Sequence, residues 1–196
     1  FEKNGYVIVP GNKNLLEKLR KIIFLKIRKG NKIKIKKNEQ ENISKIFNNF
    51  HQLVKLKDLN NLRFKIYNKI NLNHEFSDCL YNIAKDYLDN LVGNELSMQK
   101  KINLSIQMPN DKDSLLDLHS DIYAGESPFQ VVVWIPLVDA YETKSMFFTK
   151  PRYNKKMNDQ LLSSDKFTTK EMYNKNKKIF KFLNVKFGEI LIFSPL

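Results

Sequence analysis

The stretch Phe129-Gln-Val-Val-Val-Trp-Ile-Pro-Leu-Val138 is the most strand-like in the chain, and Leu118-His-Ser-Asp121 lies just before it. In an extended backbone, side chains two residues apart point to the same face. His119 and Asp121 are therefore expected to converge on one point. An imidazole and a carboxylate placed in this way can supply two of the three protein ligands in a two-histidine, one-carboxylate iron site. The alternative is a solvated loop that merely contains two polar residues.

The composition is typical of a single globular domain. The chain has 196 residues, 42% of them hydrophobic and 12% aromatic, which is enough for one sizeable core. No apolar stretch approaches the roughly 18 to 20 residues that cross a bilayer, and the N-terminal residues do not have the order of a signal peptide. Cys79 is the only cysteine, so no internal disulfide can form. These features predict a cytoplasmic protein without a membrane partner.

The net charge of +13 raises the question of nucleic-acid binding. Lysine, asparagine and isoleucine are abundant along the whole chain, as biased codon usage would produce. The densest basic block, Lys26 to Lys37, contains no aromatic residue that could stack on bases. We therefore expect a solvated lysine-rich surface and no nucleic-acid partner. Attraction of an anionic small substrate is compatible with this charge.

The first half of the chain has the apolar spacing of helices. The leucine and isoleucine stripe of Asn14 to Lys29 ends at Gly30, and that of Phe76 to Leu91 ends at Gly93. Two further helices are predicted over Glu41 to Lys55 and Asp58 to Ile70. Lys32 to Lys36 alternates but is too short to distinguish a strand from a loop.

The second half has the pattern of strands. Lys101 to Met108 alternates strictly between apolar and polar residues, and Gly188 interrupts the last apolar run. A helix over Lys170 to Phe182 is compatible with the polar stretch that precedes that run. The organisation is α+β: one domain over residues 1–196, mainly helical over 1–95 and β-rich over 96–196. The predicted strands are Tyr6 to Val9, Lys101 to Met108, Phe129 to Val138, Ser145 to Thr149 and Val185 to Phe193.

The H-x-D beside a strand suggests a double-stranded β-helix, a cupin-like jelly-roll with the N-terminal helices packed on it. In that fold the polar residues Asn103 and Gln107 would point into the barrel mouth, where with Ser145 they would hold a carboxylate or a keto acid. The alternative is a one-sided sheet with these residues in water. Trp134 is predicted to belong either to the core or to a platform for the substrate.

Several stretches of this sequence resemble the phytanoyl-CoA-hydroxylase-like Fe(II)/2-oxoglutarate oxygenases. The resemblance is greatest to the branch found in sporadic carbohydrate-biosynthesis clusters, and it covers nearly the whole chain. Gly188 to Ser194 is similar to the strand that leads into the second histidine of that family. The other matching stretches are Leu91 to Glu95, Gln99 to Gln107, Leu118 to Asp121, Gly125 to Pro128, Val131 to Asp139 and Thr143 to Met146.

This resemblance implies an iron dioxygenase with 2-oxoglutarate as co-substrate, O2 as oxidant and a sugar-related substrate, acting in carbohydrate or surface-polysaccharide biosynthesis. It makes His119 and Asp121 metal ligands. In the family a second histidine and then an arginine follow the last strand. Here His51 and His74 fall in predicted helices or their connections, and Arg152 comes too early. We therefore expect the third ligand to lie beyond Leu196. We also expect the C-terminal strands of the jelly-roll to be missing from this sequence.

Two functions from different classes follow from these features. The first is an oxygenase that hydroxylates or otherwise oxidises a small sugar-related molecule. The second is a cupin-like module that binds a sugar or a sugar nucleotide without turning it over. The retained H-x-D favours the enzyme. Neither the substrate, the oxidised position nor the oligomeric state is set by the sequence.

Overall fold

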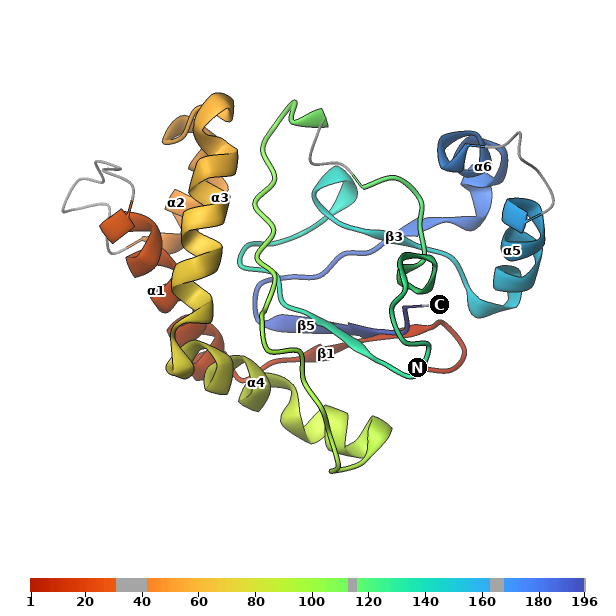
Figure 1. Ribbon diagram of the computed structural model, residues 1–196, viewed down its shortest axis with the longest axis horizontal. Helices are drawn as coiled ribbons and strands as arrows, with labels where there is room; N and C mark the ends of the chain where they lie inside the picture. The colour runs from red at the N-terminus through yellow and green to blue at the C-terminus, as the bar shows by residue number, and fades with distance from the viewer. Residues whose placement is uncertain (31–41, 113–115, 163–167, 196) are drawn as a thin grey trace. The chain divides into compact units, whose positions relative to one another are not determined.

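The computed structural model describes residues 1–30, 42–112, 116–162 and 168–195 (Figure 1). The predicted alternation of Lys32 to Lys36 lies outside these residues. The chain forms two compact units. The helical unit comprises Gly11–Asp113, and the sheet unit comprises Phe1–Pro10 together with Ser114–Leu196. That residues 1–196 form a single domain, divided near residue 95, stays a prediction.

The four helices predicted for the first half are confirmed, with shifted bounds. The second predicted helix is shorter than expected and ends in a single 3-10 turn, η2. Gly93 caps the last helix with a positive φ of 86°, a conformation that favours glycine. The elements are α1 (Lys13–Gly30), α2 (Ile43–Asn48), η2 (Phe50–Gln52), α3 (Leu56–Asn71) and α4 (His74–Val92).

The core of the helical unit lies where α1 packs against α3 and α4. Each of these helices buries the apolar stripe that its sequence spacing predicts. In proteins, most helical stability comes from such packing and not from helix propensity. The most completely buried side chains of this core are Leu16, Leu19, Ile23, Ile66, Ile70 and Phe76.

The stretch Lys101 to Met108 is extended but pairs with no strand in the described chain. It lies along α3, whose side chains satisfy its backbone (Figure 1). Asn71 accepts from the N–H of Ile102 at 2.6 Å and donates to its carbonyl at 3.0 Å. Arg63 Nε donates to the carbonyl of Ile106 at 3.0 Å. The predicted alternation is therefore a one-sided contact with a helix and not part of a sheet.

Cys79 is buried in the helical unit, and its thiol lies 3.1 Å from the carbonyl oxygen of Leu15. Burial raises the pKa of this thiol, so little thiolate exists at neutral pH. We expect the folded protein to react with Ellman's reagent about a hundredfold more slowly than the urea-unfolded protein, because only the thiolate attacks. Stopped-flow absorbance measures both rates. Equal rates would show that the helical unit opens readily.

Strand β5 (Glu189–Phe193) is the centre of a three-stranded antiparallel sheet. It pairs on one side with β1 (Tyr6–Pro10) and on the other with β2 (Val132–Trp134). In this register Leu191 lies opposite both Ile8 and Trp134. Gly188, with a φ of 109°, precedes the strand. The first predicted strand, Tyr6 to Val9, is thus confirmed, and the last, Val185 to Phe193, is confirmed over its C-terminal half.

The remaining elements of the sheet unit are short. A second antiparallel sheet pairs β3 (Phe147–Phe148) with β4 (Lys181–Phe182). The helix predicted over Lys170 to Phe182 ends at Asn176, and β4 follows it. Helices and turns make up the rest: η4 (Asp121–Ala124), η5 (Glu142–Lys144), η6 (Pro151–Tyr153), α5 (Asn154–Leu162), α6 (Thr169–Asn176) and η7 (Lys177–Ile179).

The core of the sheet unit is built on Leu183, Val185 and Leu191, all fully or almost fully buried. Side chains from β1, β2, β3 and β5 pack against them. Trp134 is one of these, which fits the core alternative predicted for it. The others are Tyr6, Ile8, Met146, Phe148 and Phe193.

The predicted α+β class is confirmed, but the jelly-roll is wrong for the described residues. They form six helices and two small antiparallel sheets, with no double-stranded β-helix. The predicted strand Phe129 to Val138 pairs only over Val132–Trp134. Pro136 follows at once, and proline cannot donate to a sheet. This apolar run is also mostly half-buried, and Phe129 at its start is exposed.

None of the helices in the described part of the chain is both long and apolar enough to cross a bilayer.

Candidate metal centre

His119 and Asp121 converge as their spacing predicts. The backbone of Ser120 between them is extended, with φ −123° and ψ 134°. His119 Nε2 consequently lies 3.4 Å from Asp121 Oδ1. The histidine side chain is 51% exposed and the aspartate 33%, so both are partly exposed to solvent. Asp121 also begins the turn η4.

The second ring nitrogen of His119 is held by the backbone. Nδ1 lies 2.6 Å from the carbonyl oxygen of Asp117, and a carbonyl can only accept. Nδ1 therefore carries the proton, and in the neutral ring Nε2 presents its lone pair toward the Asp121 carboxylate. Two electron-rich atoms are stable at this separation when a proton or a metal cation lies with them.

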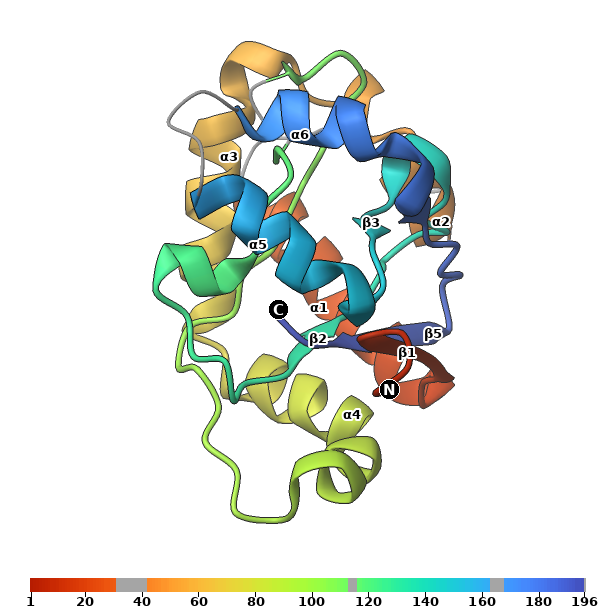
Figure 2. The ribbon, with the colours of Figure 1, turned by 90° about the vertical axis from the view of Figure 1, so that its right-hand side faces the viewer.

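Ser120 fixes the segment to the central sheet. Its hydroxyl donates to the carbonyl oxygen of Pro195 at 2.7 Å. The neighbouring Ser194 donates its N–H to the carbonyl of Gly5, next to β1, at 2.9 Å. The pair is therefore attached directly to the end of β5, as Figure 2 shows for the turn η4 and the C-terminal end of the described chain.

A third metal ligand is not present among the described residues, where no group of three His, Cys, Asp or Glu side chains is placed to hold an ion. His51, in η2, and His74, at the start of α4, belong to the helical unit.

The other predicted site residues are divided between the two units. Asn103 and Gln107 are exposed residues of the helical unit. Ser145 belongs to the sheet unit, and within the described chain its buried hydroxyl has no hydrogen-bond partner. Trp134 packs on the sheet core. Their roles toward 2-oxoglutarate or substrate stay predictions.

Sequence reasoning missed the residues that support the pair. Ser120 was a detectable candidate, because its hydroxyl lies between the two predicted ligands. Asp117 contributes only its backbone carbonyl. Any residue at this position would supply the same group, so the sequence gives no sign of the contact. The basic residues on α5 were seen only as part of a dispersed positive charge.

Comparison of the chain with models of known protein families, with curated proteins and with solved structures gives no match. The resemblance to the 2-oxoglutarate oxygenases is therefore an expectation from the motifs alone. What supports a function is the local geometry of His119 and Asp121.

Proposed function

We propose that the protein is an Fe(II)- and 2-oxoglutarate-dependent oxygenase acting on a small, sugar-related molecule. His119 and Asp121 are two of the three protein ligands of its iron. One observation carries the proposal: Nε2 and Oδ1 lie 3.4 Å apart while Nδ1 is fixed by a backbone carbonyl.

The donor set fits such an ion. A nitrogen and a carboxylate oxygen, each about 2.1 Å from one metal and at about a right angle, lie about 3 Å apart. The observed separation is close to this without any rearrangement of the backbone. Histidine ligands also commonly donate their second N–H to a carbonyl, which orients the ring. Asp117 supplies that carbonyl here.

The residues of this chain have separable tasks in the proposed reaction. Bound iron with 2-oxoglutarate and O2 supplies the oxidising chemistry, as cofactors do for reactions beyond amino-acid side chains. His119 and Asp121 hold the ion, and Ser120 keeps them at the end of β5. We assign Ser145, which belongs to the same unit as the pair, to a carboxylate of 2-oxoglutarate.

Anaerobic titration with Fe(II) in the presence of 2-oxoglutarate tests the metal site. We expect a visible charge-transfer band, strengthened by added imidazole, which supplies a ligand of the histidine type. His119→Ala should weaken Fe(II) binding about tenfold or more, since even the loss of an outer-shell partner of a ligand costs about that much.

His74→Ala is the matched control, because it removes a histidine of the helical unit and leaves the pair intact. A band of unchanged intensity and affinity in His119→Ala would overturn the proposal. Succinate formation in the presence of candidate sugars then separates an oxygenase from a binding protein.

A further inference from the structure

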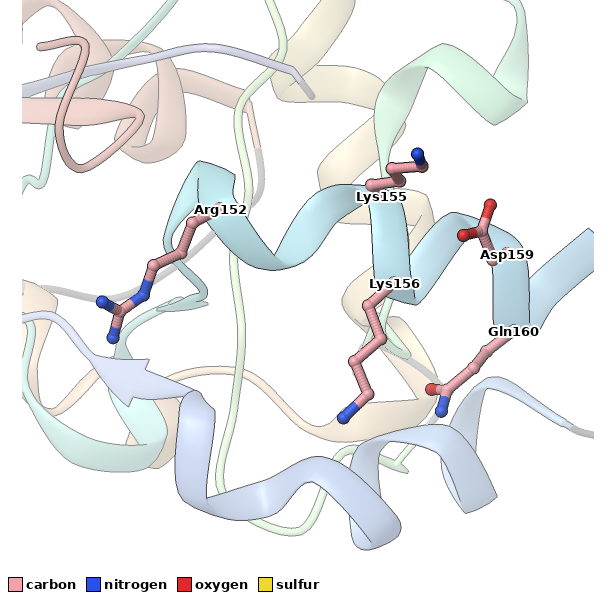
Figure 3. Close-up of a pocket in the computed structure, with 5 residues that line it drawn as sticks. All are labelled: Arg152, Lys155, Lys156, Asp159 and Gln160. Atoms are coloured by element: carbon pink, nitrogen blue, oxygen red, sulfur yellow. The ribbon is translucent and has the colours of Figure 1, made fainter.

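A shallow groove runs along α5, in the sheet unit. Its volume is about 500 Å³, and its five lining residues are Arg152, Lys155, Lys156, Asp159 and Gln160 (Figure 3). Pockets for small molecules usually lie between about 300 and 1,000 Å³. The groove thus has room for a small ligand, and each of its five lining residues carries a charged or polar group.

The positive charge of the groove is not neutralised within the described chain. Arg152, Lys155 and Lys156 are exposed and form no ion pair with a described acidic residue, although Asp159 lines the same groove. Arg152 is nevertheless held in place. Its guanidinium donates to the Tyr153 hydroxyl at 2.8 Å and lies 4.7 Å from the centre of that ring. This partner is neutral, so the guanidinium charge remains available to an anion.

The position of the lysines on the helix adds to this potential. Lys155 and Lys156 lie in the first turn of α5, which contains no acidic residue. The N-terminal end of a helix carries a partial positive charge, so lysines there are unfavourable unless an anion compensates them. Residues that cost stability in this way are characteristic of binding sites.

One of the lining side chains, that of Gln160, is held by a contact between two helices. The buried Asn176, in α6, donates to Gln160 Oε1 at 3.2 Å and to the carbonyl of Met172 at 3.0 Å. Figures 1 and 2 both show α5 and α6 side by side. In Figure 3, Lys156 and Gln160 point to the same side of α5, whereas Lys155 and Asp159 point away from it.

We propose that this groove binds the phosphate or diphosphate group of a small phosphorylated ligand. Arginine and lysine both recognise phosphate, arginine through its planar fork and lysine as a point charge. The Gln160 amide beside them suits hydroxyl groups on the same ligand. None of the described lining residues is aromatic, so the groove lacks the stacking surfaces of a single-stranded nucleic-acid site.

This inference rests on α5 and α6 and not on His119 or Asp121. Phosphate binding needs no metal, so its loss and the loss of the proposed iron site are measured separately.

Isothermal titration calorimetry with inorganic pyrophosphate, in metal-free buffer at physiological salt, tests the groove. We expect one pyrophosphate per chain. The double variant Arg152→Gln/Lys156→Gln should weaken binding about tenfold or more, because it removes two charge-assisted hydrogen-bond donors to the anion.

The control is Lys57→Gln/Lys65→Gln, which removes the same charge from exposed positions of α3. It should bind pyrophosphate like the parent protein. Equal weakening in both double variants would mean diffuse attraction by the net charge and would overturn the proposal, as would no binding by the parent. Tighter binding of a single-stranded oligonucleotide, steeply lost with salt, would also overturn it.

Discussion

Leu191→Ala is expected to destabilise the sheet unit by about 2–5 kcal/mol, the range for truncating a buried leucine. Leu191 is 0% exposed at the centre of β5, opposite Ile8 and Trp134. Loss of its side chain removes apolar contacts to both neighbouring strands and leaves a cavity that a sheet cannot readily close. Since whole domains are stable by only about 5–15 kcal/mol, this one change removes a large share of the unit's stability.

Trp134 is the only tryptophan of the chain and belongs to this core, so its fluorescence reports unfolding of the sheet unit directly. Urea titration followed by this signal gives the free energy of unfolding. Leu116→Ala is the control: that leucine is 75% exposed in the same unit and should change stability by less than about 0.5 kcal/mol. Similar losses for the two variants would contradict the assignment of this core.

The helices could be predicted because their apolar residues recur at helical spacing over several turns, which rarely happens by chance. Leu16, Leu19 and Ile23 satisfy the period over several turns, and the structure buries them all. The sheets were less predictable. An apolar run such as Phe129 to Val138 does not fix how many residues pair, and only Val132–Trp134 do so. Strand length depends on a partner that is distant in sequence.

The extended stretch Lys101 to Met108 also shows that a local pattern does not identify the packing partner. The alternation of Lys101 to Met108 places Ile102 and Met108 on one face, and both are buried. It could not reveal what they are buried against. A helix that offers Arg63 and Asn71 satisfies the extended backbone as well as a strand does, and no local pattern distinguishes the two.

One part of the candidate site could be predicted from the sequence, and the other part could not. Convergence of His119 and Asp121 follows from local backbone geometry, so two residues sufficed to predict it. The bond from Ser120 to Pro195 joins segments 75 residues apart, and the groove depends on a contact between α5 and α6. Such features arise from tertiary structure and have no local signature.

The second large effect is expected at Arg63, which joins α3 to the extended stretch. Its guanidinium donates to the Ile106 carbonyl through Nε at 3.0 Å and again through Nη2, and Nη2 pairs with Asp111 at 2.8 Å. The Arg63 side chain is 25% exposed and that of Asp111 is 10% exposed. Removing the guanidinium therefore leaves a largely buried carboxylate and a carbonyl without this donor.

We expect Arg63→Ala to destabilise the helical unit by about 2–4 kcal/mol, because breaking a buried pair costs about 3–5 kcal/mol and partial exposure screens part of it. Urea unfolding followed by far-UV circular dichroism, which reports mainly the helices, measures the loss. Lys65→Ala, exposed on the same helix, should have little effect. In a double-mutant cycle with Asp111→Asn, the two changes should be clearly less than additive, since each removes the same contact. Strict additivity, or an Arg63→Ala loss no larger than that of Lys65→Ala, would mean that the stretch Lys101 to Met108 is held by its buried apolar side chains alone.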